Sequence, residues 1–181
     1  MQDKIFGAFL QRQFQEGQAL AEASDLLDLF PMTTIDGEPP QTYIVRFLCD
    51  GLVKTSEGEI EKANHFEVMI NFPSDYLRRA DPFQVLTWFG PANVFHPNIS
   101  ARAPFICVGK LAPNTPLVDL LYQCFEIITY NKVTMREDDA LNVDACRWAR
   151  ENQSRFPIDR RPLKRRALSI QVRESKHVVP A

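Results

Sequence analysis

The chain has 181 residues and a formal net charge of −2, with 45% hydrophobic and 24% charged residues. These values are typical of one globular domain. The sequence contains no run of about 18 apolar residues, which excludes a membrane-spanning helix, and residues 1–18 are too polar for the core of a signal peptide. We therefore expect a cytoplasmic protein that has no membrane partner.

The net charge hides an asymmetry along the chain. Residues 155–181 carry eight lysines and arginines against Asp159 and Glu174, a net charge of +6, so residues 1–154 carry −8. Charge of this kind attracts partners over a distance without specifying them, so a docking segment and a solvated tail are both consistent with it. Residues 167–174 place apolar side chains two apart, which suits either an extra strand at a sheet edge or a disordered tail.

The first part of the chain has the pattern of a helix. Apolar residues recur every four positions within residues 4–24, which predicts a helix with one apolar face. The stretch DLLDLFP follows, and we expect Pro31 to end it. Residues 35–41, IDGEPPQ, then have the composition of a turn, because Asp-Gly tolerates a positive φ and Pro-Pro forbids helix.

Three strand-like stretches come next, at residues 42–49, 65–72 and 83–90. The first closes at the turn signal Asp50-Gly51. In the second, alternate apolar side chains face one way: Phe66, Val68, Ile70 and Phe72. The short connections between these stretches predict an antiparallel meander with one face covered by helix.

Two helices are expected in the last third of the chain. The first, within residues 115–130, begins with Thr115 as its N-cap and Pro116 at its first helical position. The second, within residues 138–157, starts with acidic residues at the positive end of the helix dipole and stops at Pro157.

The chain has four cysteines: Cys49, Cys107, Cys124 and Cys146. They include no C-x-x-C pair and the three histidines are scattered, so we expect no zinc site, disulfide framework or cofactor. Three of the thiols have apolar or strand-end neighbours typical of buried structural cysteines. Cys107 differs because it lies in an irregular, proline-rich stretch, where Gly109 leaves room for a large substrate. Lys110 could favour its thiolate if the lysine side chain turns inward.

The order of motifs around this cysteine resembles the ubiquitin-conjugating enzymes, the middle carriers of ubiquitin-like protein transfer. The resemblance rests on FPSDY at residues 72–76, HPNI at 96–99, the pair Ile106-Cys107, and DDALNVDACRW at 138–148. It is close over residues 66–157. It implies an α+β ubiquitin-conjugating (UBC) fold, with an N-terminal helix, a four-stranded antiparallel meander and C-terminal helices. It also divides the chain into a catalytic domain, residues 1–157, and a basic C-terminal extension, residues 158–181.

The resemblance assigns roles to the residues of these motifs. Cys107 is the nucleophile that accepts a ubiquitin-like protein as a thioester from an activating enzyme. The Asn98 side-chain amide donates a hydrogen bond either to the oxyanion that forms when an amine attacks the thioester, or to the loop that holds the site. His96 and Pro97 order this loop without proton transfer. The spacing from Asn98 to Cys107 is one residue longer than is usual in the family, which leaves the reach of Asn98 open.

The amine that attacks the thioester must be neutral, although the pKa of a lysine in water is about 10.4. The family solves this largely by desolvation, helped by an acidic or polar residue near the thioester. Glu137, Asp138 and Asp139 are candidates by their position in the chain. The same acids are also placed to cap the following helix, and we favour capping for Asp138 and Asp139.

The implied partners are an activating enzyme, expected at the N-terminal helix, the modifier and an acceptor protein. We do not expect nucleic acid. Two loops depart from the family pattern, YLRRADP at residues 76–82 and KLAPNTPL at residues 110–117. Because such loops dock RING-type ligases in the family, their divergence argues against that docking. The chain is more similar to the prokaryotic branch, whose bacterial members belong to ubiquitin-like conjugation operons that often act in antiviral defence.

Two other functions remain open. The same fold exists as inactive adaptor domains that only bind partner proteins, but those variants lack a cysteine at the position of Cys107. An unrelated thiol hydrolase would use Cys107 with His96 or His65 as its base, and would need an imidazole within hydrogen-bond reach of the sulfur.

Overall fold

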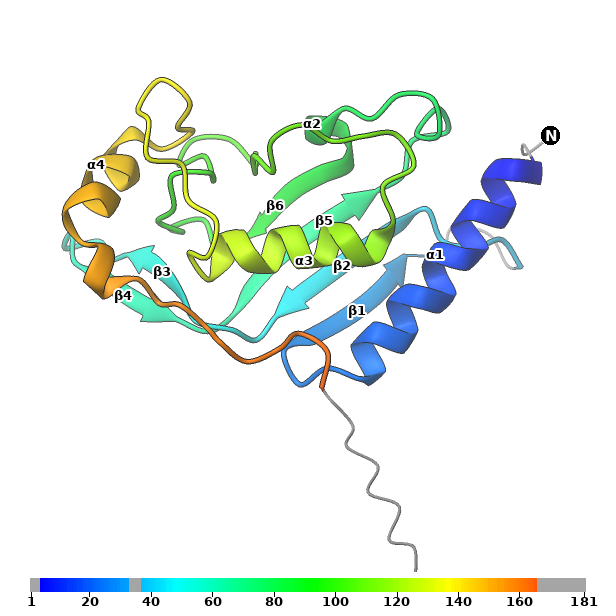
Figure 1. The fold of residues 1–181 in the computed structure, drawn as a ribbon, viewed down its shortest axis with the longest axis horizontal. Coiled ribbons are helices and arrows are strands. Elements are labelled where there is room, and N and C mark those ends of the chain that lie inside the picture. Colours follow the sequence, from blue (N-terminus) through cyan, green and yellow to red (C-terminus); the bar gives the residue numbers. More distant parts are fainter. Residues whose placement is uncertain (1–3, 33–36, 166–181) are drawn as a thin grey trace, which may run out of the picture.

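The computed structural model describes residues 4–32 and 37–165. In chain order the elements are α1 (Lys4–Glu22), β1 (Leu27–Met32), β2 (Thr42–Phe47), β3 (Gly51–Lys54), β4 (Ile60–Ala63), β5 (Phe66–Asn71), α2 (Pro82–Val85), β6 (Leu86–Gly90), α3 (Leu117–Ile128), α4 (Val143–Glu151) and a 3₁₀ turn (Gln153–Arg155). Within the described residues, four strands form an antiparallel sheet in the order β1-β2-β5-β6. Helix α3 lies across one face of this sheet with α1 beside it (Figure 1). The predicted α+β architecture is confirmed.

The core lies between the sheet and the two helices, and it follows from the alternation of side chains along the strands. The inward residues of β2 and β5 pair across the sheet and are fully buried: Tyr43 with Ile70, Val45 with Val68, and Phe47 with Phe66. None of the helices in the described ranges has the length and apolar composition to cross a bilayer.

The stretch DLLDLFP forms most of β1, and Pro31 lies inside this strand rather than ending it. Pro31 is paired in register with Tyr43, and the strand continues to Met32. A proline is accommodated there because β1 is an edge strand, so the missing N–H removes no ladder hydrogen bond if it faces away from β2.

A second sheet and a short helix interrupt the predicted meander. Asp50-Gly51 does not close β2, which ends at Phe47; Gly51 instead begins β3, and β3 pairs with β4. Residues 83–85, predicted as strand, belong to α2. The side chain of Asp81 accepts a hydrogen bond from the Phe83 N–H at 3.0 Å and so caps this helix.

The N-terminus of α3 is not capped by Thr115. Pro116 occupies the cap position, while the Thr115 hydroxyl donates to the Ala112 carbonyl at 2.7 Å. The first helical N–H, from Leu117, donates instead to Oε1 of Gln13 on α1, at 2.7 Å. Gln13 is only 2% exposed, so a buried side chain of one helix satisfies the end of another.

The cap of α4 also differs from the prediction. The Asn142 side chain accepts a hydrogen bond from the Ala145 N–H at 3.1 Å, so Asn142, and neither Asp138 nor Asp139, is the N-cap. Asp144 is the acidic residue in the first turn.

After α4, the chain returns across the molecule to the C-terminal end of α1 (Figure 1). Leu163 is 1% exposed and joins the main core, and the Arg165 N–H donates to the Ala23 carbonyl at 2.8 Å. Residues 158–165, the first eight of the predicted extension, therefore include contacts with the rest of the described chain. The predicted extra strand at residues 167–174 lies outside the described residues.

Candidate active site

Cys107 lies in the irregular stretch between β6 and α3, directly beside the HPN motif. The Cys107 N–H donates to the Asn98 carbonyl at 2.8 Å, and Ile99 and Ile106 form an antiparallel bridge. Both isoleucines are fully buried. They anchor two strand-like segments in the core, which brings Asn98 and Cys107 side by side although nine residues separate them.

The Asn98 side chain connects three segments of the site. Its Nδ2 donates to the Cys107 carbonyl at 3.2 Å, and its Oδ1 accepts a hydrogen bond from the Thr134 N–H at 2.9 Å. The side chain thus ties the HPN motif to the cysteine segment and to the loop that follows α3. Asn98 is buried, so water cannot easily replace these two hydrogen bonds.

His96 and Pro97 hold the same loop from its other side. His96 Nδ1 accepts a hydrogen bond from the Asn98 N–H at 3.0 Å, and burial lowers the pKa of His96 from 6.5 to about 3. The imidazole is therefore neutral at physiological pH with its proton on Nε2, and its ring packs edge-on against Tyr130 at 4.3 Å. The Pro97 carbonyl accepts from Leu141 N–H at 2.9 Å and from Asn142 N–H at 3.2 Å.

The four thiols differ in exposure. Cys107 is partly exposed, whereas Cys49, Cys124 and Cys146 are buried, and none forms a disulfide. Burial raises the pKa of Cys49 and of Cys124 to about 12, and it also raises the pKa of Cys146. The predicted burial of these three is confirmed. They are poor nucleophiles because the thiolate is the reactive form.

The lysine beside the cysteine segment is Lys132, for which no sequence pattern predicted a role. Its Nζ donates to the Val108 carbonyl at 2.6 Å, and a Cβ built on Gly109 would lie 3.9 Å from that nitrogen. Lys110 is exposed instead of turned inward. Gly109 has a φ of +88°, a conformation that favours glycine, so the chain turns away directly after the cysteine segment.

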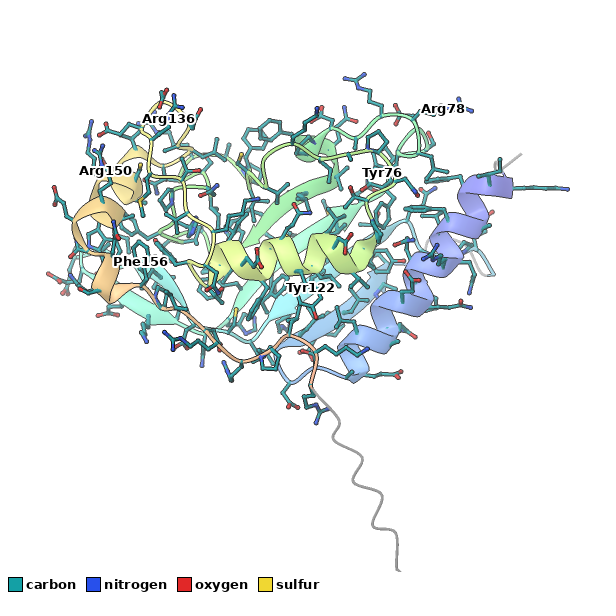
Figure 2. The ribbon with its side chains drawn as sticks, in the orientation of Figure 1. Tyr76, Arg78, Tyr122, Arg136, Arg150 and Phe156 are labelled. Atoms are coloured by element: carbon teal, nitrogen blue, oxygen red, sulfur yellow. The ribbon has the colours of Figure 1, made fainter. Side chains whose placement is uncertain are left out.

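The three candidate acids lie in the loop between α3 and α4 and are paired with arginines. Glu137 forms ion pairs with Arg147 at 2.9 Å and with Arg150, and Asp138 pairs with Arg136. Arg136 and Arg150 lie at the α4 end of the molecule, opposite α1 (Figure 2).

These arginines lower the pKa values of Glu137 and Asp138 through hydrogen bonds and charge. Asp139 lies 3.4 Å from Arg136. Within the described residues, no hydrogen bond or ion pair joins any of the three carboxylates to Cys107 or Asn98. Their loop meets the site at other residues: the Thr134 N–H donates to Asn98, and Leu141 and Asn142 donate to the Pro97 carbonyl.

Neither candidate base of a thiol hydrolase is bonded to the sulfur. The accepting nitrogen of His96 is occupied by a backbone N–H. His65 is exposed and lies 3.4 Å from Glu67, at the beginning of β5. In residues 4–32 and 37–165, no three His, Cys, Asp or Glu side chains are grouped to hold a metal ion.

The chain also resembles known proteins in its fold. It is similar to a ubiquitin-conjugating enzyme E2 domain from Toxoplasma gondii, with a TM-score of 0.53 and 17% identity over 81% of this chain and 88% of that one. A Plasmodium yoelii structure described as a ubiquitin-conjugating enzyme gives a TM-score of 0.51 and 18% identity, over 80% of this chain and 83% of that one. The fold is that of ubiquitin-conjugating enzymes. No protein-family model matches the sequence, and no curated protein matches it significantly.

Within this UBC fold, the structure brings the HPN motif and the cysteine together, as their order in the sequence predicted. The acidic candidates lie on the loop between α3 and α4, which contacts the site through Thr134 and Leu141, while their carboxylates pair with arginines. Two site residues were missed, Lys132 and Thr134. Each meets the site through a single hydrogen bond across a long sequence separation, to Val108 and to Asn98 respectively. No local pattern signals such a contact.

Proposed function

We propose that the chain carries a ubiquitin-like protein as a thioester on Cys107, receives it from an activating enzyme, and transfers it to an acceptor amine. The observation that carries this proposal is the pairing of the cysteine segment with the HPN segment in a UBC fold. It leaves Cys107 partly exposed and without a disulfide, while the other three thiols are buried. An adaptor that only binds partners would need neither feature.

In the first step, the Cys107 thiolate attacks the thioester carbonyl of the modifier on the activating enzyme. A bond forms between Cys107 Sγ and the carbonyl carbon, the bond to the activating enzyme's cysteine breaks, and that sulfur leaves as a thiolate. One thioester replaces another, so the exchange is close to neutral in free energy. The chain therefore has to present an accessible sulfur and little more.

In the second step, a neutral acceptor amine attacks the same carbonyl carbon. The carbonyl oxygen becomes an oxyanion, the carbon–sulfur bond breaks and Cys107 leaves as a thiolate. The nitrogen gives up one proton to solvent water, and an amide remains. Asn98 holds the carbonyl of Cys107 through one N–H of its amide. The second N–H of that amide is the group proposed to reach the oxyanion, and the one bond that it already makes fixes its orientation.

We further propose that the chain belongs to the prokaryotic branch of the family and does not dock RING-type ligases in the standard way. The support is the divergence of the two loops expected to face a ligase. Arg78 and Arg79 in the first loop and Lys110 in the second are exposed, and Figure 2 shows Arg78 near the N-terminal end of α1. The activating enzyme is proposed to contact α1.

The test is reconstitution with ATP and with the activating enzyme and modifier encoded beside the gene, followed by non-reducing electrophoresis. We expect a band shifted by one modifier that a thiol reductant removes. It should be absent in Cys107→Ala and resistant to reductant in Cys107→Ser, because an oxygen ester replaces the thioester. Cys49→Ala serves as the matched control, because it removes another free thiol, and it should charge normally.

The adaptor function is the other outcome of the same experiment. If the activating enzyme charges its own cysteine but no modifier reaches the chain, the carrier function is wrong. Binding of the chain to the activating enzyme without charging would then favour an inactive UBC-fold adaptor.

A further inference from the structure

The outer edge of β1 is open along its backbone. Leu48 N–H donates to the Leu26 carbonyl at 2.9 Å, so in this antiparallel register the even-numbered residues of β1 bond to β2. The N–H and C=O groups of Leu27 and Leu29, and the C=O of Pro31, therefore point away from β2. Within the described residues, no backbone hydrogen bond reaches these groups.

A groove of about 290 Å³ runs beside this open edge. One wall is the last turns of α1, and the other is the first part of β1; the lining residues are Gln18, Ala21, Glu22, Leu27, Asp28, Leu29 and Phe30. Open backbone donors and acceptors next to a partly apolar groove fit an added strand better than a small molecule.

We propose that residues 167–172 of this chain add a parallel strand, six residues long, to the edge of β1, beside α1. The described chain ends beside this groove. Arg165 N–H donates to the Ala23 carbonyl at 2.8 Å, and the Arg165 guanidinium lies 3.3 Å from Asp25. The next residues thus start at the end of the groove where β1 begins, so a strand that follows the groove runs parallel to β1.

The sequence after this point matches β1 in length and has the alternation of a strand. Residues 167–172, ALSIQV, equal β1 in length, at six residues each. Leu168, Ile170 and Val172 alternate with Ser169 and Gln171. One face of the added strand is thus apolar and suits the α1 side of the sheet, and the other is polar and suits solvent.

Charge favours this segment over a second copy of the protein as the occupant of the groove. The groove and its entrance carry Glu22, Asp25 and Asp28, whereas Arg166 and Arg173 flank the proposed strand. Two β1 edges from two copies would bring these acids together, and like charges at close range are destabilising. The segment is also tethered to the groove by Arg165, which raises its effective concentration there.

The test is amide hydrogen exchange by NMR on the full chain, with sedimentation to measure its mass. The variant Leu168→Asp/Ile170→Asp places charge on the apolar face of the proposed strand. Its matched control, Ser169→Asp/Gln171→Asp, makes the same change in charge on the other face. We expect the amides of Leu27 and Leu29 to exchange at least about tenfold faster in the first variant than in the wild type, and unchanged in the control.

The observations that would overturn the proposal are distinct. Equal exchange in all three proteins would show that the segment does not cover β1. Equally faster exchange of Leu27 and Leu29 in both variants would show that the segment is held near β1 by charge alone and forms no strand. Protection that accompanies a dimeric mass would assign the edge to a second copy or to a segment exchanged between copies. None of these results depends on the chemistry of Cys107.

Discussion

At the scale of single residues, Asn98 decides how the proposed site is held together. Its side chain makes one hydrogen bond to the cysteine segment and one to Thr134. Asn98→Ala removes both, so we expect the free energy of unfolding to fall by about 1–3 kcal/mol. The rate at which a preformed thioester is discharged to free lysine should fall about 10²–10³-fold, while charging of Cys107 persists. Chemical denaturation and single-turnover discharge measure the two effects.

Asn93→Ala is the control for this substitution. Asn93 also donates from its side chain to a backbone carbonyl, that of Lys54 at 3.1 Å, but it is exposed and that bond does not involve the cysteine segment or Thr134. Asn93→Ala should change the free energy of unfolding and the rate of discharge little. A loss of discharge in Asn98→Ala without any loss of stability would contradict the loop-holding role and leave the oxyanion role alone.

His96 makes the stability of the protein depend on pH. Because burial lowers its pKa from 6.5 to about 3, the unfolded chain binds a proton below pH 6.5 that the folded chain does not. This contribution to stability is complete above about pH 6.5 and is lost on acidification, by up to about 1.4 kcal/mol per pH unit. Unfolding free energies measured between pH 7 and 5 should show this slope.

The slope should flatten in His96→Gln and persist in His65→Gln, which removes an exposed imidazole. A slope that is the same in all three proteins would show that His96 is not the responsible group. The window above pH 5 is chosen because Glu137 and Asp138, whose pKa values are lowered, lose their contributions at more acidic pH.

The sequence predicted the central part of the site but not its supports. The HPN motif and Cys107 could be placed together because the relevant residues are close in sequence and the motif order is distinctive. Lys132 and Thr134 could not, because their contacts depend on how the loop after α3 returns to the cysteine segment. The arginine partners of Glu137 were missed for the same reason: Arg147 and Arg150 are on the next helix.

At the scale of elements, the junction between α1 and α3 depends on one buried amide. Gln13 supplies the acceptor for the first N–H of α3. Gln13→Met keeps the volume but leaves that N–H without a partner, so we expect the free energy of unfolding to fall by about 1–3 kcal/mol. Gln11→Met makes the same change at an exposed position of α1 and should stay within about 0.5 kcal/mol. Equal losses would refute the capping role.

Helix periodicity and strand alternation predicted α1, α3, β2 and β5, because each buries one regular face. The ends of elements were harder to predict. Thr115 has the right chemistry for an N-cap, yet a residue distant in sequence supplies the acceptor. Pro31 was expected to end its segment, but an edge strand such as β1 tolerates a proline. The β3–β4 pair has too little apolar alternation to be recognised locally, with a burial pattern that leaves β4 without a buried residue.

At the scale of the whole molecule, the segment after α4 joins the end of the described chain to the C-terminal end of α1 and to the main core. Leu163 inserts into the main core, whereas Ile158 on the same segment is 47% exposed. Leu163→Ala should therefore lower the free energy of unfolding by about 2–5 kcal/mol, and Ile158→Ala by no more than about 0.5 kcal/mol. Chemical denaturation of both variants measures the difference. Similar small losses in both variants would show that Leu163 does not pack stably in the core. Residues 158–165 would then not hold residues 167–172 near the edge of β1.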